Sequence, residues 1–404
     1  MTALPAPLRR VRLVDPTIGA EELAAVTDVL AGGQLTVGEV NRQFEAELAQ
    51  ALGAPAAVAV SSGTAALHLA LLALGLTPGD EVVVPSLSFV ASAAVTALHG
   101  GVPVFADVVS ARRLSISPDD VARLITGRTR AVVVMHYGGD PAAVEDVVTI
   151  ARAHGVPVVE DAAHAPVVRS AAGRMLGTIG DVGCFSFHAT KNLTTGEGGL
   201  VVARDPAVLD RVRALRGHCL TTSFEGRQWA AGTGYEVSGA GLNYRLTELA
   251  AAVGRVQLRR LPDDRRRRRA LTGRYRQLLA ALPEVGLPES ALLEAGQAGA
   301  ADRDAAHHLM TVLLPAAADR ARVQERLARA GVQTSVHYPP THLFRHYRTA
   351  PDRADVRTRE RLPVTESVAS RLLTLPLHSR MDDQDVEHVV HHLAAALGRG
   401  ATAS

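Results

Sequence analysis

Short runs of β-branched residues alternate with amphipathic stretches through the first 205 residues of the chain. The amphipathic stretches include residues 118–125 and 142–153. This alternation predicts a largely parallel β-sheet with helices on both faces, because parallel strands need crossover connections that cover the sheet. The runs that we interpret as buried strands are residues 82–84, 102–105, 131–135 and 156–159, followed by 185–187 and 199–203.

The rest of the chain predicts a second, smaller unit. Residues 248–276 have a long helical pattern, and residues 284–306, rich in Gly, Ala, Pro and Glu, indicate an exposed loop. A strand at 309–314 and helices at 318–330 and 386–397 follow. Since 404 residues exceed one ordinary core, we predict two domains. Residues 1–260 form the large domain with its N-terminal segment, and residues 261–404 form the long helix and a small C-terminal α/β domain.

The composition excludes several classes of protein. With 47% hydrophobic and 21% charged residues, the chain resembles a folded soluble protein and not a disordered one. A net charge of +2 gives no overall field for nucleic acid or a membrane, and no apolar run approaches the ~20 residues that span a bilayer. Two cysteines cannot build a disulfide framework, and the first ten residues contain no apolar core of the length expected for a signal peptide. We expect a cytoplasmic protein with no nucleic-acid or membrane partner.

A run of five arginines, Arg265–Arg269, is the one feature that suggests a nucleic-acid patch. The run lies inside a helical pattern, without interleaved aromatic residues. Basic runs on a neutral protein are typically solvated helix faces, and we interpret this run in the same way. A DNA-binding regulator that uses the run is the non-enzymatic alternative.

Lys191 is the only lysine among 43 lysine and arginine residues. Arginine has replaced lysine wherever a positive charge is enough, so the remaining lysine points to chemistry that arginine cannot perform. A lysine amine can lose its proton and attack a carbonyl carbon, whereas a guanidinium stays charged. Lys191 lies in the motif CFSFHATKNLTTGEGG at residues 184–199. Schiff-base catalysis is therefore the leading hypothesis, and a surface lysine retained by chance is the alternative.

Two segments supply groups for an anion and a cation. Residues 61–67 precede an apolar helix, whose N-terminus with Gly63 and Thr64 offers N–H and hydroxyl donors to a phosphate. Asp161 ends a buried strand, at the edge where open α/β sheets bind ligands. A carboxylate buried there needs a cation, and a protonated pyridine nitrogen is one.

Further residues could surround a flat ring near the same edge. Phe89 follows a strand and could stack on the ring or pack in the core. Ser186 and His188 flank the lysine loop with hydrogen-bonding groups, and glycines at 196, 198 and 199 allow close approach to a ligand. A phosphate cradle, a ring stacker, an acid for a ring nitrogen and an amine for an aldehyde are the partners that pyridoxal 5′-phosphate (PLP) needs.

With these motifs the chain resembles the DegT/StrS-type aminotransferases, PLP enzymes that aminate keto-sugars carried on nucleotides. The resemblance implies the type I PLP-dependent transferase fold, an α/β fold whose large domain has a mostly parallel, mixed seven-stranded sheet. The family's dehydratases carry histidine in place of the lysine, so Lys191 argues against them. The resemblance runs almost end to end, through residues 32–38, 44–45, 61–67, 85–89, 136–141, 160–164, 184–199, 241–248, 257–258, 336–340 and 375–377.

The resemblance implies roles for individual residues. Lys191 is the Schiff-base lysine, Asp161 pairs with the pyridine nitrogen, and His164, at a position often occupied by glutamine, contacts the ring hydroxyl. Asn243 reaches the cofactor phosphate of the partner subunit, which implies a homodimer with shared active sites; a helix cap near Arg245 is the alternative role. The remaining assignments are phosphate binding for Gly63, Thr64 and Ser186, ring stacking for Phe89, and substrate binding for His188, His337 and Tyr338. No metal site is expected.

The predicted function is a PLP-dependent aminotransferase that moves an amino group from glutamate or glutamine to a nucleotide-linked keto-sugar. His188 makes the chain more similar to the branch that aminates C4 of UDP-linked 4-keto sugars. The GC-rich composition and the family suggest antibiotic or surface-glycan sugar biosynthesis. The alternatives are a cyclitol or another non-nucleotide ketone as acceptor, and a PLP lyase or aldolase on the same fold.

Overall fold

Seven strands form the main sheet of the computed structural model, which describes residues 9–141, 143–221, 235–288, 305–348 and 361–398. The order across the sheet is β1-β7-β6-β5-β4-β2-β3, and only β7 runs antiparallel to its neighbours. The predicted mostly parallel, mixed sheet of seven strands is therefore confirmed. The strands are β1 (Ala57–Val60), β2 (Glu81–Pro85), β3 (Val102–Ala106), β4 (Thr129–Met135), β5 (Val158–Asp161), β6 (Val182–Ser186) and β7 (Gly199–Ala203).

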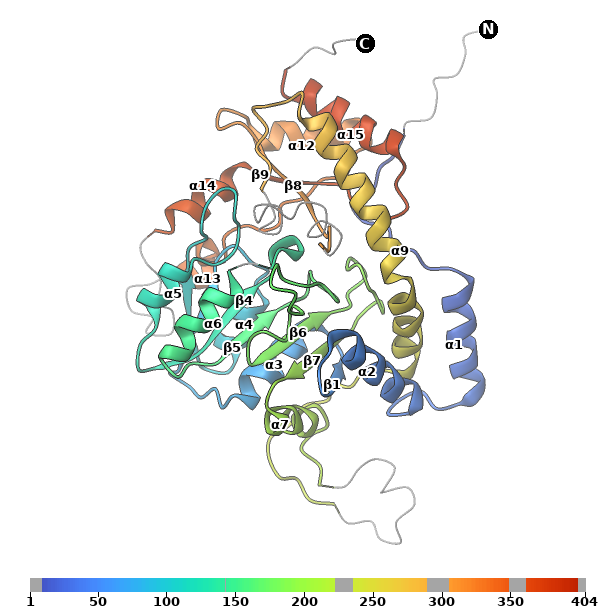
Figure 1. Cartoon of the computed structure of the whole chain (residues 1–404), viewed down its shortest axis with the longest axis vertical. Helices are drawn as coiled ribbons and strands as arrows, with labels where there is room; N and C mark the ends of the chain where they lie inside the picture. The colour runs from blue at the N-terminus through green and yellow to red at the C-terminus, as the bar shows by residue number, and fades with distance from the viewer. Residues whose placement is uncertain (1–8, 142, 222–234, 289–304, 349–360, 399–404) are drawn as a thin grey trace.

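Helices cover both faces of this sheet (Figure 1). Alternate residues of one strand enter different cores: Val82 and Val84 pack with α3 and α4, whereas Val83 packs with α5 and α6. Both faces are apolar because a parallel sheet is buried on both sides. The covering helices are α2 (Glu39–Leu52), α3 (Gly63–Ala73), α4 (Ala91–Leu98), α5 (Pro118–Leu124), α6 (Val144–Ala153) and α7 (Pro206–Arg216).

In the main sheet, the strand predictions were wrong at two boundaries and missed one strand. The strand predicted at 156–159 is β5, which begins at Val158 because Pro157 has no N–H to donate to a ladder. The strand predicted at 185–187 is β6, Val182–Ser186. The sequence Ala-Val-Ala-Val of β1 was not identified, since alanine between valines weakens the β-branched signal.

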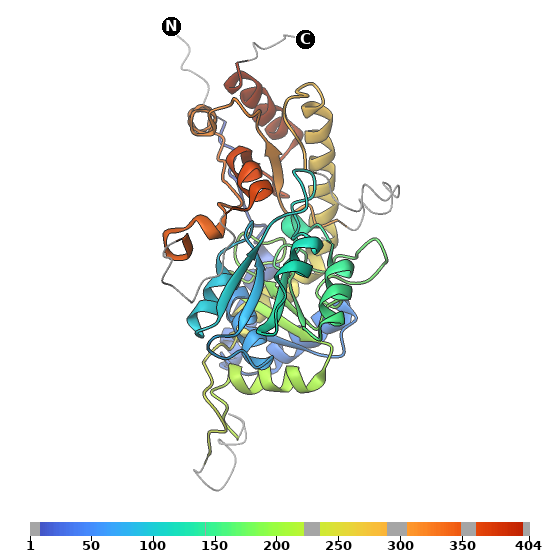
Figure 2. The same cartoon turned by 90° about the vertical axis from the view of Figure 1, so that its left-hand side faces the viewer.

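One long helix, α9 (Glu248–Leu279), runs beside both units of the molecule (Figures 1 and 2). It contacts α1 (Ala20–Gly32) and α2 at one end and α15 (Asp383–Ala396) at the other. The predicted domain boundary at 260/261 falls inside this helix and remains a prediction. The smaller unit pairs β8 (Met310–Leu313) antiparallel with β9 (Leu372–Leu375) and adds α12 (Arg320–Arg329).

The small unit follows the predicted pattern, except that β9 was not identified. Its core joins α9, both strands, α12 and α15 through residues such as Tyr275, Val312, Leu327, Leu373 and Val389. Most of the predicted loop at 284–306 lies outside the described residues. The remaining short elements are η1 (Tyr137–Gly139), η2 (Thr341–Leu343), α13 (Arg345–Arg348) and α14 (Pro363–Arg371).

The arginine run lies on α9 and makes contacts within the chain. Arg265 donates to the carbonyl oxygens of Pro166 and Val167, at 3.1 and 2.6 Å. Arg267 donates to the Met381 carbonyl at 2.6 Å, and the buried Arg268 pairs with Asp264 at 2.7 Å. The interpretation of the run as a solvated face is wrong for these three residues, because they tie α9 to both units. Across the described ranges, no helix combines the length and the apolar character needed to cross a membrane.

Candidate active site

A cavity of about 640 Å³ opens at the carboxyl ends of β4, β5 and β6. It gathers residues from β5, from the N-terminus of α3, from the β6–β7 loop and from the small unit. All but one of the predicted site residues line it: Gly63, Thr64, Phe89, Asp161, His164, Ser186, His188, Lys191, His337 and Tyr338. The exception is Asn243.

Lys191 projects from the loop between β6 and β7 into this cavity. Its backbone N–H donates to the His188 carbonyl at 2.9 Å, and the Thr195 N–H donates to the Phe187 carbonyl at 2.9 Å, so the loop is tightly folded. Gly199 closes the loop, since a Cβ there would lie 2.4 Å from the Ser62 carbonyl oxygen. Burial lowers the pKa of Lys191 to about 8, against an opposing effect of Asp161. A neutral, nucleophilic amine is therefore accessible near physiological pH.

Asp161 is the last residue of β5 and is buried at the cavity floor. Its Oδ1 accepts a hydrogen bond from the Ala163 N–H at 3.1 Å. Burial raises the pKa of this carboxyl, and the charges of Lys191 and His136 act in the opposite direction. A cation on the cavity side would therefore be bound favourably.

The neighbouring Glu160 faces the opposite side of the sheet and anchors the end of β5. Its carboxylate accepts backbone N–H bonds from Gly177, Ile179 and Gly180 at 2.6 to 2.7 Å. The Glu160 carboxylate also contacts His136 Nε2 at 2.8 Å. Because neighbouring strand residues point to opposite faces, this network holds Asp161 toward the cavity.

The N-terminus of α3 forms an anion cradle against β6. Ser62 caps the helix by accepting the Ala65 N–H at 3.0 Å. A Cβ on Gly63 would lie 2.7 Å from the Ser186 Cβ, so only glycine permits this approach. The first helical N–H groups and the Thr64 and Ser186 hydroxyls can therefore bind a phosphate.

Phe89 is 53% exposed and lines the cavity, so the alternative that it packs in the core is wrong. Its ring centroid lies 6.0 Å from that of Tyr338. The exposed ring face is free to cover a flat aromatic ligand.

His164 has a fixed proton position. The Gly138 N–H donates to its Nδ1 at 3.2 Å, so the ring proton resides on Nε2, which lies 2.9 Å from the Tyr338 hydroxyl. Burial lowers the pKa of His164 well below its usual range, so the ring is neutral. His164 therefore donates its Nε2–H to the Tyr338 hydroxyl at the wall of the cavity.

Two other predicted histidines border the cavity in different settings. Burial lowers the pKa of His337 to about 4, and its Nδ1 lies 3.0 Å from the Thr374 hydroxyl. His188 is exposed at the entrance, with Nδ1 2.9 Å from the Thr190 hydroxyl and Nε2 3.7 Å from Glu197. His337 can therefore act as a neutral wall, and His188 can meet a substrate that enters.

Asn243 is exposed and its side chain does not line the cavity. Its backbone bridges to Gly217, and the next residue, Tyr244, accepts the Ser61 N–H at 2.8 Å. Thr247 caps α9 by accepting the Ala250 N–H, so the alternative role of Asn243 as a cap is wrong.

His308 is near the site but was not among the predicted site residues. This buried residue precedes β8, and its ring centroid lies 4.2 Å from that of His164. Nothing local in the sequence distinguishes it from its neighbour His307, because its position depends on how the small unit meets the sheet.

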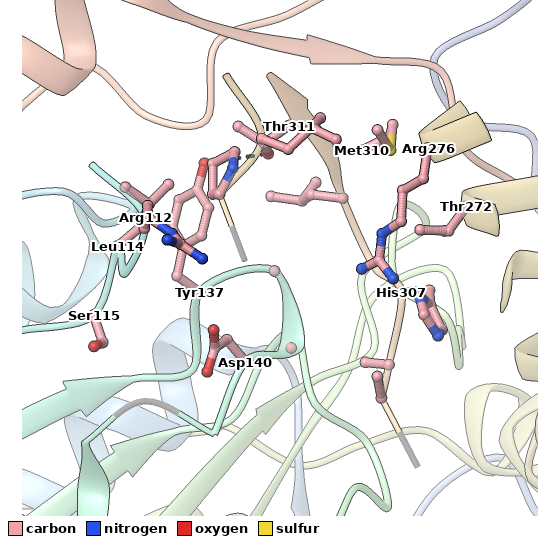
Figure 3. A pocket seen from close by; sticks show the side chains of 17 residues that line it. Arg112, Leu114, Ser115, Tyr137, Asp140, Thr272, Arg276, His307, Met310 and Thr311 are labelled. Carbon is pink, nitrogen blue, oxygen red and sulfur yellow. Dashed lines mark hydrogen bonds between the residues drawn. The ribbon is translucent and has the colours of Figure 1, made fainter. Parts of the chain in front are cut away.

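A second cavity, of about 110 Å³, is lined by Tyr137 and by residues of the segment before β8 (Figure 3). Tyr137 donates its hydroxyl to the backbone carbonyl of His337, a residue that lines the larger cavity. Its described lining residues contain no lysine or cysteine, and they include Arg112, Asp140, Thr272, Arg276 and His307. Without a nucleophile of that kind, this cavity is a poorer candidate for reaction at a carbonyl.

The larger cavity fits PLP on four independent features. It has a buried amine of lowered pKa, a buried carboxylate that favours a cation, a glycine-dependent anion cradle and an exposed aromatic ring. Among the residues that the structure describes, no group of three or more His, Cys, Asp or Glu could hold a metal ion. Fold and site together define a PLP-dependent enzyme.

Comparison with known proteins identifies the family. The model of the DegT/DnrJ/EryC1/StrS aminotransferase family matches residues 16–394, and the chain belongs to this family. The dTDP-4-dehydro-2,3,6-trideoxy-D-glucose 4-aminotransferase of Saccharopolyspora spinosa is 38% identical over 393 residues, covering 96% of this chain and 97% of the relative.

Solved structures of aminotransferases have the same fold as this chain. The aminotransferase TlmJ from Streptoalloteichus hindustanus has a TM-score of 0.86 at 38% identity, covering 96% of this chain and 99% of that one. The PMP-form of the sugar aminotransferase Spr1654 from Streptococcus pneumoniae has a TM-score of 0.85 at 25% identity, covering 96% and 99%. PLP is the cofactor of the enzyme formed by the present chain.

Proposed function

We propose that this enzyme transfers an amino group from glutamate or glutamine to a keto-sugar carried on a nucleotide. The observation that carries the proposal is the single lysine, buried with a lowered pKa opposite Asp161, in a cavity of about 640 Å³. The name of the S. spinosa relative, a dTDP-sugar 4-aminotransferase, supports the choice of acceptor. The setting would be amino-sugar biosynthesis in the cytoplasm.

Each residue has a task in this reaction. When bound, PLP supplies an aldehyde that exchanges between amines and a ring that withdraws electrons from the substrate carbon. Lys191 Nζ holds the cofactor and, once released, moves the proton at the reacting carbon. Asp161 keeps the ring nitrogen protonated, and His164 contacts the ring hydroxyl. Gly63, Thr64 and Ser186 bind the phosphate, Phe89 covers one ring face, and His188, His337 and Tyr338 contact the substrate.

Isotope transfer tests the substrate class. Purified enzyme is incubated with nitrogen-labelled glutamate or glutamine and a panel of nucleotide-linked keto-sugars, cyclitol ketones and free keto-sugars. We expect the label in a nucleotide-linked product with an intact carbon skeleton, detected by mass spectrometry. Label only in a cyclitol or free ketone contradicts the nucleotide-linked acceptor, and a cleaved skeleton indicates a lyase or aldolase.

We also propose that the active unit is a homodimer in which Asn243 serves the partner's cofactor phosphate. The exposed Asn243 side chain, outside its own chain's cavity, supports this arrangement. A neutral amide can donate to a phosphate without adding charge.

Hybrid dimers test the shared site. Lys191→Ala and Asn243→Ala chains are mixed under exchanging conditions, and hybrids are isolated with two affinity tags. If the site is shared, one hybrid pocket carries both defects and the other carries neither, so about half of the hybrid sites regain activity. Homodimers of each variant are the controls. Verified hybrids without recovered activity would show that Asn243 acts within its own chain.

A further inference from the structure

His308 connects the small unit to two parts of the active site. Its ring is tilted by 37° against His164, with 4.2 Å between the centroids. Its Nδ1 lies 2.8 Å from Oδ1 of Asn192, the residue that directly follows Lys191 in the chain. Its backbone N–H donates to the Gly138 carbonyl at 3.2 Å, and Gly138 in turn donates to His164.

The hydrogen-bond directions in this cluster are determined. Asn192 Nδ2 donates to the Ala306 carbonyl at 2.7 Å, so Asn192 Oδ1 is the end that faces His308 and accepts. His308 therefore carries its proton on Nδ1. Burial lowers the pKa values of His308 and His164 well below their usual range, so both rings are neutral. The cluster orders the site without placing another charge beside Lys191.

We propose that His308 is a positioning residue that fixes the Lys191 loop through Asn192 and the His164 ring through face contact. The proposal rests on the proposed aminotransfer, in which Lys191 and His164 act on the cofactor. A residue that only filled space here would not need a polar nitrogen aimed at the neighbour of Lys191. Because a displacement of about 1 Å at a catalytic group lowers rates by roughly 10²-fold, the tether matters for turnover.

A double-mutant cycle measures the tether. His308→Phe keeps an aromatic ring against His164 and removes the donor to Asn192, and Asn192→Ala removes the acceptor. We expect each variant to lose about 10- to 100-fold in kcat with a small change in KM, and the double variant to lose no more than the worse single variant. Losses that multiply would show that the two residues act independently and would overturn the proposal.

His307→Phe is the matched control, because His307 is also buried but lines the second cavity (Figure 3). We expect this variant to lower the melting temperature without the loss in kcat. An equal loss in kcat for His307→Phe would show that the loss in His308→Phe comes from disturbed packing in general, and would overturn the proposal.

Labelling of the single lysine gives a readout that needs no substrate. An amine-reactive reagent is applied to the cofactor-free protein across a pH series, and modification of the Lys191 peptide is followed by mass spectrometry. The titratable groups that interact electrostatically with Lys191 are Asp161, His164, His308 and His337. The three histidines are neutral, because burial lowers their pKa values. The midpoint in the wild type should lie near 8, because burial lowers the pKa of Lys191 to about 8.

Loosening of the Lys191 loop should expose the amine to water and raise this midpoint by about one unit toward the ordinary lysine value of about 10.4. We expect the rise in His308→Phe and in Asn192→Ala, and not in His307→Phe. If His308→Phe does not fold, Asn192→Ala carries the test alone. An unchanged midpoint with kcat within about twofold of wild type overturns the proposal. A wrong substrate assignment would abolish turnover in every protein, wild type included, and leave the labelling result intact.

Discussion

The Lys191→Arg variant is expected to fold normally and to lose transamination by about 10⁴-fold or more. Arginine keeps the positive charge beside Asp161, but its guanidinium does not lose a proton and cannot bond to the cofactor. Steady-state turnover with the best acceptor measures the loss. Since Lys191 is the only lysine, borohydride reduction of the wild-type holoenzyme should fix the cofactor on one peptide and leave the variant unlabelled.

A second variant separates the lost amine from disturbed packing. In Lys191→Ala, an added small primary amine should restore part of the activity, because it replaces the missing proton carrier. The same amine should not help Lys191→Arg, where the guanidinium fills the space. Circular dichroism and melting temperature serve as controls for folding. Turnover of Lys191→Arg within tenfold of wild type would refute the assignment of Lys191 and the mechanism built on it.

The fold was predictable where a strand contains a continuous β-branched run. Val82–Val84 and Ala131–Met135 are buried on both faces of the sheet, so their sequence carries a strong signal. In β1, and in β9 with its Leu-Leu-Thr-Leu, the sequence does not distinguish strand from helix. Pairing with β7 and β8 decides those two segments, and pairing between distant segments cannot be read locally.

The site was predictable where a residue's function depends on its own element. Asp161 at a strand end and Gly63 at a helix start have local signals, and the cavity contains both. His308 and Asn192 meet only because the small unit packs against the lysine loop. The contacts of the arginine run were not predictable, because Arg265 and Arg268 donate to carbonyl oxygens remote in sequence, which a helical pattern does not reveal.

The Asp161→Asn variant is expected to bind the cofactor and to lose transamination by about 10²- to 10³-fold or more. Asparagine has nearly the same shape and the Ala163 N–H can still donate to its Oδ1. It carries no negative charge, so the ring nitrogen loses its proton and the reacting carbon loses its electron sink. Single-turnover kinetics with glutamate should show the loss in the first half-reaction, which isolates the chemistry from sugar binding. A rate within threefold of wild type would mean that another acid serves the ring.

The same substitution should stabilise the cofactor-free protein in alkali, which distinguishes a site built for a cation from a structural carboxylate. Burial raises the pKa of Asp161, so the folded state binds the Asp161 proton more tightly than the unfolded state does. The stability of the fold therefore falls as the pH rises through the pKa of Asp161 in the folded state. Lys191, with a pKa of about 8, offsets this charge while protonated and loses that ability above pH 8. At pH 9 and above, cofactor-free Asp161→Asn should therefore melt about 2 °C or more above cofactor-free wild type. The difference in melting temperature should narrow at lower pH and reverse when PLP is bound, because the bound cation then favours the carboxylate.

Glu160→Gln is the matched control. The Glu160 carboxylate is bound by three backbone N–H groups, so that variant should melt lower than wild type at every pH, with or without cofactor. A lower melting temperature for cofactor-free Asp161→Asn at pH 9 would assign Asp161 a structural role like that of Glu160.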